Sequence, residues 1–287
     1  MPRPKSRRAD PPYVEAKLPP RPAGALRIAT WNVNSVRLRI ALVAKLARLS
    51  GADVICLQET KAENHVFPAA ALARLGFVHQ HFQGDKGYNG VAILSRVPLA
   101  NHGRRLWAGK EDSRHVEATL PGGIDLHCVY VPAGGDVPDP AANPKFAHKL
   151  RFLEHLAEHW AAQPRGVRRV LVGDLNVAPL ETDVWSHKQL LDVVSHTPPE
   201  TTRFAKAIAA QGWVDAMRAL HPEPKPIFTW WSYRNRDWRA SDRGRRLDHV
   251  WITPELRPAL KGAWVMKGAR DWPRGSDHVP VVIDLSV

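Results

Sequence analysis

The stretch LVGDLN, residues 171–176, marks the end of a wholly apolar, β-rich run that begins at Arg169 and predicts a buried strand over 169–176. Gly173 lacks a Cβ and therefore permits a sharp turn at the strand end. Side chains two residues apart on an extended chain point to the same face, so Asp174 and Asn176 are expected side by side at a sheet edge. The alternative is a simple turn in which both side chains bond to nearby backbone.

Apolar runs and helical spacings alternate along the rest of the chain. Strands are predicted over 27–32 and 53–59, and apolar residues at 36, 40, 43 and 46 have the spacing of a helix that ends at Gly51. This order favours a parallel pair of strands, with Asn32 and Glu59 on neighbouring strand ends. Further helices are predicted over 67–75, 145–162 and 201–211, and further strands over 91–95, 116–120, 124–131, 228–233, 247–252 and 279–285. This mixture predicts an α/β fold in which helices cover sheets.

The length, the apolar content and the net charge of the chain limit the kinds of protein it can be. The chain has 287 residues, of which 44% are apolar, and a net charge of +13. This charge suits a polyanionic partner, with nucleic acid first, and an anionic membrane surface or a merely soluble basic surface as alternatives. No apolar stretch is long enough to span a membrane, and the N-terminus lacks the apolar core of a secretory signal. We therefore expect an intracellular, cytoplasmic protein, nucleoid-associated if bacterial, and a monomer.

The first 24 residues differ from the remainder. They hold seven prolines and six basic residues against two acids, which predicts a disordered basic tail before a folded domain over 25–287. The two cysteines, Cys56 and Cys128, each lie in an apolar, strand-like stretch. We expect buried thiols that pack as small apolar groups, and neither a disulfide framework nor a zinc cluster.

Polar groups gather where predicted strands begin or end. They are Asn32 with Glu59, Asp174 with Asn176, Asp248, Asp277 with His278, and Tyr130. These acids have no cysteine among them, so a hard cation such as Mg²⁺ or Mn²⁺ fits better than zinc, with Glu59 as the best ligand. Either Asp248 or Asp277 would orient His278. Each group taken alone also fits a solvated acid, a loop pair or a core tyrosine.

The groups occur within short motifs in a fixed order: WNVN (31–34), LQETK (57–61), GDLN (173–176), RLD (246–248) and SDH (276–278). In this order, with 87–94 and 228–233 between them, the motifs closely resemble the exonuclease III family of apurinic/apyrimidinic endonucleases, within the endonuclease/exonuclease/phosphatase superfamily. The resemblance runs from about Arg27 to the C-terminus. It implies a four-layer α/β sandwich, in which two packed mixed sheets are flanked by helices, and a single catalytic domain over 25–287.

The resemblance also implies roles for residues at matching positions. The implied catalytic residues are Tyr130, Asp174, Asn176, Asp248 and His278. The implied Mg²⁺ site, in which Mn²⁺ is the alternative ion, draws on Asn32, Glu59, Asp174, Asn176, Asp277 and His278. The implied DNA contacts and pocket residues, together with the arginines of the basic loop after the aromatic run, are Asn34, Trp230, Leu247, Arg234, Arg236 and Arg245.

Two positions depart from the family pattern. Ala133 stands where many relatives have an amide, and Arg245 replaces an aromatic residue found in some relatives. The implied activity is a Mg²⁺-dependent DNA repair phosphodiesterase that cleaves 5′ to abasic sites in duplex DNA and trims blocked 3′ ends as a 3′–5′ exonuclease. One alternative is a phosphatase or phosphodiesterase acting on inositol phosphates or phospholipids. The other is an inactive nucleic-acid-binding protein.

Overall fold

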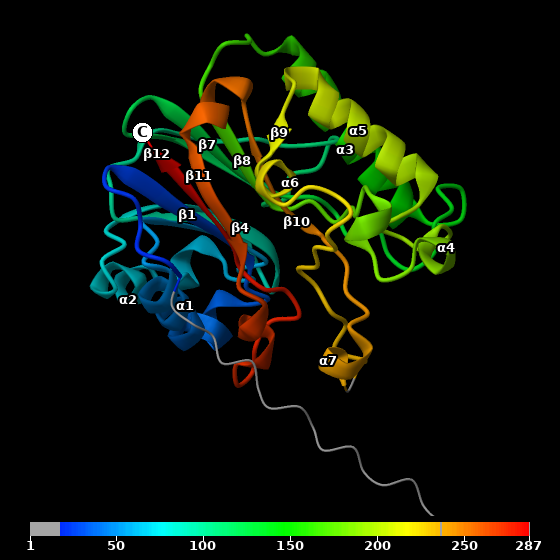
Figure 1. Ribbon diagram of the computed structural model, residues 1–287, viewed down its shortest axis with the longest axis horizontal. Coiled ribbons are helices and arrows are strands. Elements are labelled where there is room, and N and C mark those ends of the chain that lie inside the picture. Colours follow the sequence, from blue (N-terminus) through cyan, green and yellow to red (C-terminus); the bar gives the residue numbers. More distant parts are fainter. Residues whose placement is uncertain (1–17, 236, 287) are drawn as a thin grey trace, which may run out of the picture.

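The computed structural model describes residues 18–235 and 237–286, in which the strands form two packed six-stranded mixed sheets (Figure 1). The first sheet has the order β11 (Leu260–Val265), β12 (Val281–Ser286), β1 (Ala25–Asn32), β2 (Val54–Gln58), β4 (Tyr88–Ser95) and β3 (His79–Asp85). The second sheet has the order β5 (Ala100–Arg104), β6 (His115–Leu120), β7 (Ile124–Tyr130), β8 (Arg169–Asp174), β10 (Asp248–Ile252) and β9 (Val214–Asp215). The predicted parallel pairing of β1 with β2 is confirmed.

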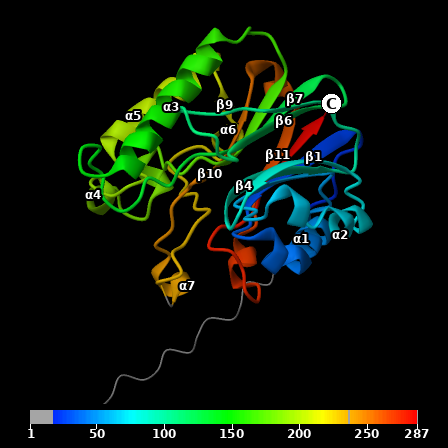
Figure 2. The ribbon, with the colours of Figure 1, turned by 180° about the vertical axis from the view of Figure 1, so that it is seen from behind.

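Helices cover the outer faces of both sheets, which completes the predicted four-layer sandwich (Figure 2). The α-helices are α1 (Val36–Ser50), α2 (Ala69–Arg74), α3 (Pro144–Ala162), α4 (His187–Leu190), α5 (Pro198–Gln211), α6 (Ala216–Leu220) and α7 (Trp238–Ser241). Short 3₁₀ helices are η1 (Asn64–Val66), η2 (Glu181–Asp183), η3 (Pro254–Ala259) and η4 (Lys267–Asp271). No helix among the described residues combines the length and the apolar character needed to cross a bilayer.

The central core lies between the two sheets. It takes alternate residues of most strands, such as Leu126 and Cys128 of β7, together with Cys56 of β2. Both cysteines are buried free thiols, as expected, and burial raises the pKa of the Cys56 thiol. The intervening residues of β7 face outward, where Val129 packs under α3 and α5. This alternation decides which side chains of the second sheet are available outside the core.

Local capping signals set the helix ends. Gly51 adopts a left-handed conformation and ends α1, as predicted. The helix α5 begins at Pro198, three residues before the predicted start at Thr201. Proline is tolerated in the first turn, where its missing N–H would be unpaired anyway. Thr197 and Glu200 form the capping box that fixes this start.

The predicted strand over 228–233 is wrong. Trp230 forms single bridges to Arg245 and to His278 and belongs to no extended ladder, while the next residue, Trp231, is buried in a different cluster. Four strands were missed, namely β3, β5, β9 and β11. All four are the edge strands of the two sheets, where a strand is covered less completely and its sequence is correspondingly less apolar.

The described part of the predicted tail, residues 18–24, has contacts with the folded domain. The backbone N–H of Leu18 donates to Leu49 O at 3.3 Å, and the carbonyl of Pro19 accepts from Arg27 at 3.0 Å. Arg21 forms an ion pair with Asp53. Residues 1–17 lie outside the described residues.

Candidate active site

The predicted polar groups meet where strands of both sheets end at the same side of the sandwich. Asn32 ends β1, Glu59 follows β2, and His278 precedes β12 in the first sheet. Tyr130 ends β7 and Asp174 ends β8 in the second sheet. Asp248 begins β10, which runs antiparallel to β8 and pairs Asp248 directly with Asp174. Strand ends of the two sheets therefore supply the two halves of one site.

Asn32 joins these halves. Its amide nitrogen lies 2.9 Å from Glu59 Oε1 and 2.8 Å from Asp174 Oδ2. Its amide oxygen accepts from the backbone N–H of Asn34 at 3.1 Å, so the nitrogen rather than the oxygen faces the two acids. The Tyr130 hydroxyl donates to Glu59 Oε1 at 2.9 Å. The resulting network holds the carboxylates of Glu59 and Asp174 on either side of one amide.

Glu59 is kept ionised by its neighbours. Burial raises the pKa of its carboxyl, but the hydrogen bond from Asn32 and the Lys61 ammonium outweigh burial, and the pKa lies below its usual value. Lys61 Nζ lies 2.8 Å from Glu59 Oε2 and 2.8 Å from Asn34 Oδ1. Lys61 lies within the LQETK motif but was not predicted as a site residue. An ionised, partly exposed carboxylate is the ligand type that a hard cation prefers.

Gly173 and Asn176 explain how Asp174 is presented. A Cβ at Gly173 would lie 1.8 Å from Val129 O, so only glycine lets β8 approach β7 this closely. The chain is not extended beyond Asp174, because Asn176 has a φ of 51°. The side chains still meet, with Asn176 Nδ2 3.2 Å from Asp174 Oδ2 and 2.9 Å from Val131 O. The expected neighbours are correct, but a turn rather than strand alternation brings them together.

His278 lies between two buried acids. Its Nδ1 is 2.8 Å from Asp248 Oδ2, and its Nε2 is 3.6 Å from Asp174 Oδ2. Burial lowers the pKa of His278, but Asp248 and Asp174 outweigh burial and raise it to about 10. Burial also raises the pKa of Asp174, and the nearby Asp248 and Glu59 add to this effect against the opposing charge of His278. Of the two predicted partners, Asp248 is therefore the one that contacts the imidazole.

Asp277 points to other groups. Its Oδ2 accepts from Trp230 Nε1 at 3.0 Å, and its Oδ1 lies 3.3 Å from Asn34 Nδ2. These contacts tie the SDH motif to the WNVN motif and to the aromatic segment. Asn34, Asp277 and Trp230 thus form one side of the site, next to Lys61.

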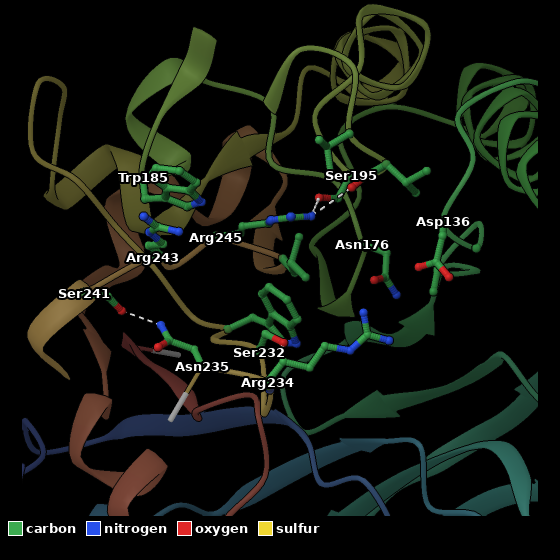
Figure 3. A pocket seen from close by; sticks show the side chains of 16 residues that line it. Asp136, Asn176, Trp185, Ser195, Ser232, Arg234, Asn235, Ser241, Arg243 and Arg245 are labelled. Carbon is green, nitrogen blue, oxygen red and sulfur yellow. Dashed lines mark hydrogen bonds between the residues drawn. The ribbon is translucent and has the colours of Figure 1, made fainter. Parts of the chain in front are cut away.

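A pocket of about 740 Å³ opens beside the catalytic groups (Figure 3). The residues from the sequence prediction that line it are Asn176, Trp230, Arg234, Arg245 and Leu247. Arg245 is held in the wall, because its Nη1 donates to Val194 O at 2.9 Å and to Ser195 Oγ at 2.8 Å. Its guanidinium also lies 5.2 Å from the Trp230 ring centre. Ala133 lines the pocket as well, and Arg236 lies outside the described residues.

Two buried cations near the site were missed. Lys149 of α3 is buried, donates to Asn176 O at 2.6 Å and forms an ion pair with Glu200. Arg114 lies 4.8 Å from the Tyr130 ring centre and donates to Tyr130 O at 3.3 Å. A signal existed for Lys149, since it occupies a position on the apolar stripe of the predicted helix over 145–162.

Comparison with known proteins identifies the family. The model of the Endonuclease/Exonuclease/phosphatase family matches residues 29–278. The DNA repair nuclease APEX1 of Danio rerio is 30% identical over 92% of this chain and 84% of its own length. Exodeoxyribonuclease III of Haemophilus influenzae is 26% identical over 89% of this chain and 98% of its own length.

Solved structures give the same result. An AP endonuclease from Archaeoglobus fulgidus superposes with a TM-score of 0.85 and 33% identity, over 91% of this chain and all of that chain. A 3′ phosphatase from Neisseria, NExo, bound to a product DNA hairpin, has a TM-score of 0.84 and 32% identity, over 91% of this chain and 99% of that one. The chain therefore belongs to the endonuclease/exonuclease/phosphatase family, as a hydrolase of the branch that includes exodeoxyribonuclease III and the AP endonucleases.

Proposed function

We propose that this protein is a divalent-metal-dependent DNA repair phosphodiesterase that hydrolyses the backbone 5′ to abasic sites and trims blocked 3′ ends. One observation carries the proposal. The ionised Glu59, the buried Asp174 and the charged His278 meet beside an arginine-lined pocket that has room for an extruded sugar. The pocket adjoins them through two of its lining residues, since Asn176 bonds to Asp174 and Trp230 pairs with His278. The names of the relatives support DNA as the substrate, and the net charge of +13 suits a polyanion.

The donor set fits a hard cation. The residues proposed to hold Mg²⁺, or Mn²⁺ in its place, are Glu59 with Asn32, Asp174, Asn176 and Asp277. His278 is the sixth residue that the resemblance implies as a ligand, but its ring is charged and has no lone pair for a cation, so we propose that it acts on the phosphate instead. Asp174 and Asp248 place carboxylate oxygens within 4.8 Å of each other, and Asp248 Oδ1 is buried without a hydrogen-bond partner among the described residues. When bound, the ion would neutralise charge on the scissile phosphate and orient it.

The protein's own residues supply the rest of the chemistry. Asp174 takes the proton of the attacking water, a role suited to a carboxylate whose pKa is raised by burial. Charged His278 and the Asn176 amide stabilise the negative charge that grows on the phosphate. Asp248 holds His278 in position, and Tyr130 fixes Glu59 through its hydroxyl.

The pocket and its arginines would bind the damaged strand. Trp230 and Leu247 form an apolar wall for a sugar without its base. Asn34, Arg234, Arg236 and Arg245 would contact the DNA backbone. Because Arg245 is already bonded to Ser195 and Val194, its charge is fixed in place before DNA arrives.

A substrate panel tests this function. The metal-stripped protein is incubated with Mg²⁺ and, in turn, an abasic duplex, an intact duplex, a duplex with a 3′-phosphate and an inositol phosphate. We expect rapid cleavage of the abasic duplex, release of the 3′-phosphate, and no inositol phosphatase activity. Asp174→Asn should abolish turnover, whereas the exposed control Asp139→Asn should leave it unchanged. Preference for the inositol phosphate, or no turnover at all, would overturn the proposal.

A further inference from the structure

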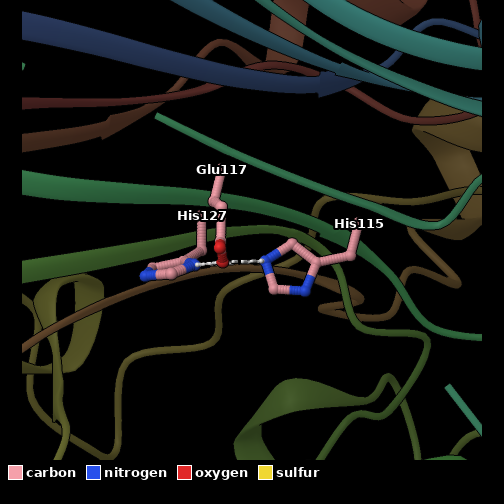
Figure 4. Close-up of side chains that lie close together, drawn as sticks. All are labelled: His115, Glu117 and His127. Atoms are coloured by element: carbon pink, nitrogen blue, oxygen red, sulfur yellow. Dashed lines mark hydrogen bonds and ion pairs between the residues drawn. The ribbon is translucent and has the colours of Figure 1, made fainter. Parts of the chain in front are cut away.

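A second acid–histidine group, which shares no residue with the catalytic groups, lies on the second sheet (Figure 4). His115 and Glu117 are two residues apart on β6, and Glu117 pairs across the strands with His127 of β7. Their neighbours Val116 and Cys128 point into the core between the sheets, so the three polar side chains point outward, under α3. We propose that His115, Glu117 and His127 form a second metal site, which takes a divalent transition ion of the zinc class.

The ligand geometry supports this proposal. His127 Nδ1 lies 3.1 Å from His115 Nε2 and 3.1 Å from Glu117 Oε2, and the third side of the triangle, from His115 Nε2 to Glu117 Oε2, is 3.7 Å. Ligand atoms around a tetrahedral zinc ion lie about 3.4 Å from one another, since each is about 2.1 Å from the metal. One ion can therefore reach all three atoms with very small movements.

No arrangement of protons on the two histidines gives favourable hydrogen bonds among all three donor atoms. The indole N–H of Trp107 donates to His115 Nδ1 at 3.2 Å, so neutral His115 carries its proton on Nε2. In the first case His127 Nδ1 is unprotonated and accepts the proton of His115 Nε2, so the lone pair of His127 Nδ1 lies against the Glu117 carboxylate. In the second case His127 Nδ1 is protonated and donates to Glu117, so two N–H groups, on His127 Nδ1 and His115 Nε2, lie against each other. Either choice leaves two like groups 3.1 Å apart, whereas a cation attracts all three lone pairs.

Two neighbours set the affinity. Arg105 Nη2 lies 3.2 and 3.3 Å from the two carboxylate oxygens of Glu117, so it competes with the ion for that charge. Metal on His115 Nε2 moves the remaining proton to Nδ1, where it faces the Trp107 N–H. Both contacts oppose binding, and removing either should strengthen it.

The donor atoms select the ion and its effect. Two imidazole nitrogens and one carboxylate oxygen are a zinc-type set, whereas Mg²⁺ takes oxygen ligands almost exclusively. An ion here would join β6 to β7 three residues before Tyr130, the catalytic tyrosine of the proposed function. We infer a bracing role for the strands beneath the active site, separate from the chemistry itself.

Zinc binding tests the site. The metal-stripped full chain is titrated with Zn²⁺ in excess Mg²⁺, which occupies the oxygen-rich catalytic site, and bound zinc is counted by mass spectrometry. We expect one tightly bound Zn²⁺ and a rise in melting temperature. Glu117→Gln and His127→Gln should each weaken binding by more than about 100-fold, since loss of a ligand exceeds the effect of an outer contact. Cleavage of abasic DNA in Mg²⁺ should stay unchanged in both.

A matched control and two opposite variants complete the test. His187 and His196 lie 2.8 Å apart with Glu181 on the far nitrogen, so their donors do not converge, and His187→Gln should leave zinc binding unchanged. Trp107→Phe and Arg105→Gln should bind Zn²⁺ more tightly than the wild type. The proposal is overturned if the wild type takes up no zinc in excess Mg²⁺, or if Glu117→Gln and His127→Gln bind zinc as the wild type does.

Discussion

The catalytic edge and the outer face of the second sheet both combine histidine with carboxylates, but they hold the proton differently. At the catalytic edge, Asp248 and Asp174 raise the pKa of His278 to about 10, so the imidazole is a cation. On the outer face, burial and His127 lower the pKa of His115, so its imidazole is neutral. A charged imidazole suits an anion such as phosphate, whereas a neutral one offers a lone pair to a metal. The balance between burial and the neighbouring charges therefore decides which ligand each ring can take.

The largest expected difference in activity is between two variants, each of which removes one histidine from one of the two clusters. His278→Asn removes the charged donor and should lower the single-turnover rate of abasic-site cleavage by about 100- to 1000-fold. His127→Gln should leave that rate unchanged. Rate measurements on both variants, at saturating DNA, check this contrast. Equal losses in the two variants would show that the clusters act as one unit.

The two acids Glu59 and Glu117 give the next contrast. Glu59→Gln should lower activity at low Mg²⁺, with partial recovery at high Mg²⁺ or in Mn²⁺, because a neutral amide holds a hard cation more weakly. Glu117→Gln should have a normal Mg²⁺ requirement and lose only zinc binding. Activity is measured across a Mg²⁺ titration. Wild-type turnover of Glu59→Gln at low Mg²⁺ would rule out Glu59 as a ligand.

A smaller effect is expected at Lys149, which is fully buried and bonds to the backbone of the catalytic loop. Lys149 Nζ donates to Asn176 O, so Lys149→Met should lower kcat about tenfold with little change in KM, in keeping with a group that acts on the transition state. Lys149→Met leaves the buried carboxylate of Glu200 without its cation, which could destabilise the fold by itself. The double variant Lys149→Met/Glu200→Gln removes both charges and separates this loss of stability from the effect on catalysis. Lys145→Met, on the exposed side of the same helix, is the control. A change in KM alone would contradict the positioning role.

The smallest effect on activity is expected at His249, a third buried histidine. Burial and the charge of Arg246 lower the pKa of His249 to about 4, while Nε2 bonds to Val177 O at 2.8 Å. The fold therefore favours the neutral ring. This contribution to stability is complete above the usual pKa of 6.5 and is lost as the pH falls toward 4, because only the unfolded chain takes up the proton.

Chemical denaturation at several pH values checks whether the stability contributed by His249 falls as the pH is lowered. His249→Gln should lose less stability than the wild type between pH 7 and pH 5, with normal cleavage at pH 7. An identical loss in the two proteins would show that His249 does not titrate as the buried contacts require.

Sequence patterns predicted helix-covered sheets and the polar groups at strand ends, whereas the four layers and the roles of the site residues came from the family resemblance. Apolar runs predict strands, and a polar residue directly after such a run must lie where that strand ends, as Asn32, Glu59 and Asp174 do. What was missed depends on contacts between distant segments. Lys149 reaches Asn176 only after α3 packs on the second sheet, and the His115–Glu117–His127 triangle needs the register of β6 against β7. Edge strands were missed because their sequences are less apolar.

The most direct test of the central claim is the chemical nature of the ends produced from an abasic duplex. Hydrolysis 5′ to the abasic site, with Asp174 activating water, predicts a 3′-hydroxyl on the upstream fragment and a sugar phosphate on the downstream one. Both should require a divalent ion and disappear in Asp174→Asn. An unsaturated sugar at the 3′ end, the mark of elimination rather than hydrolysis, or full activity in Asp174→Asn, would contradict this account.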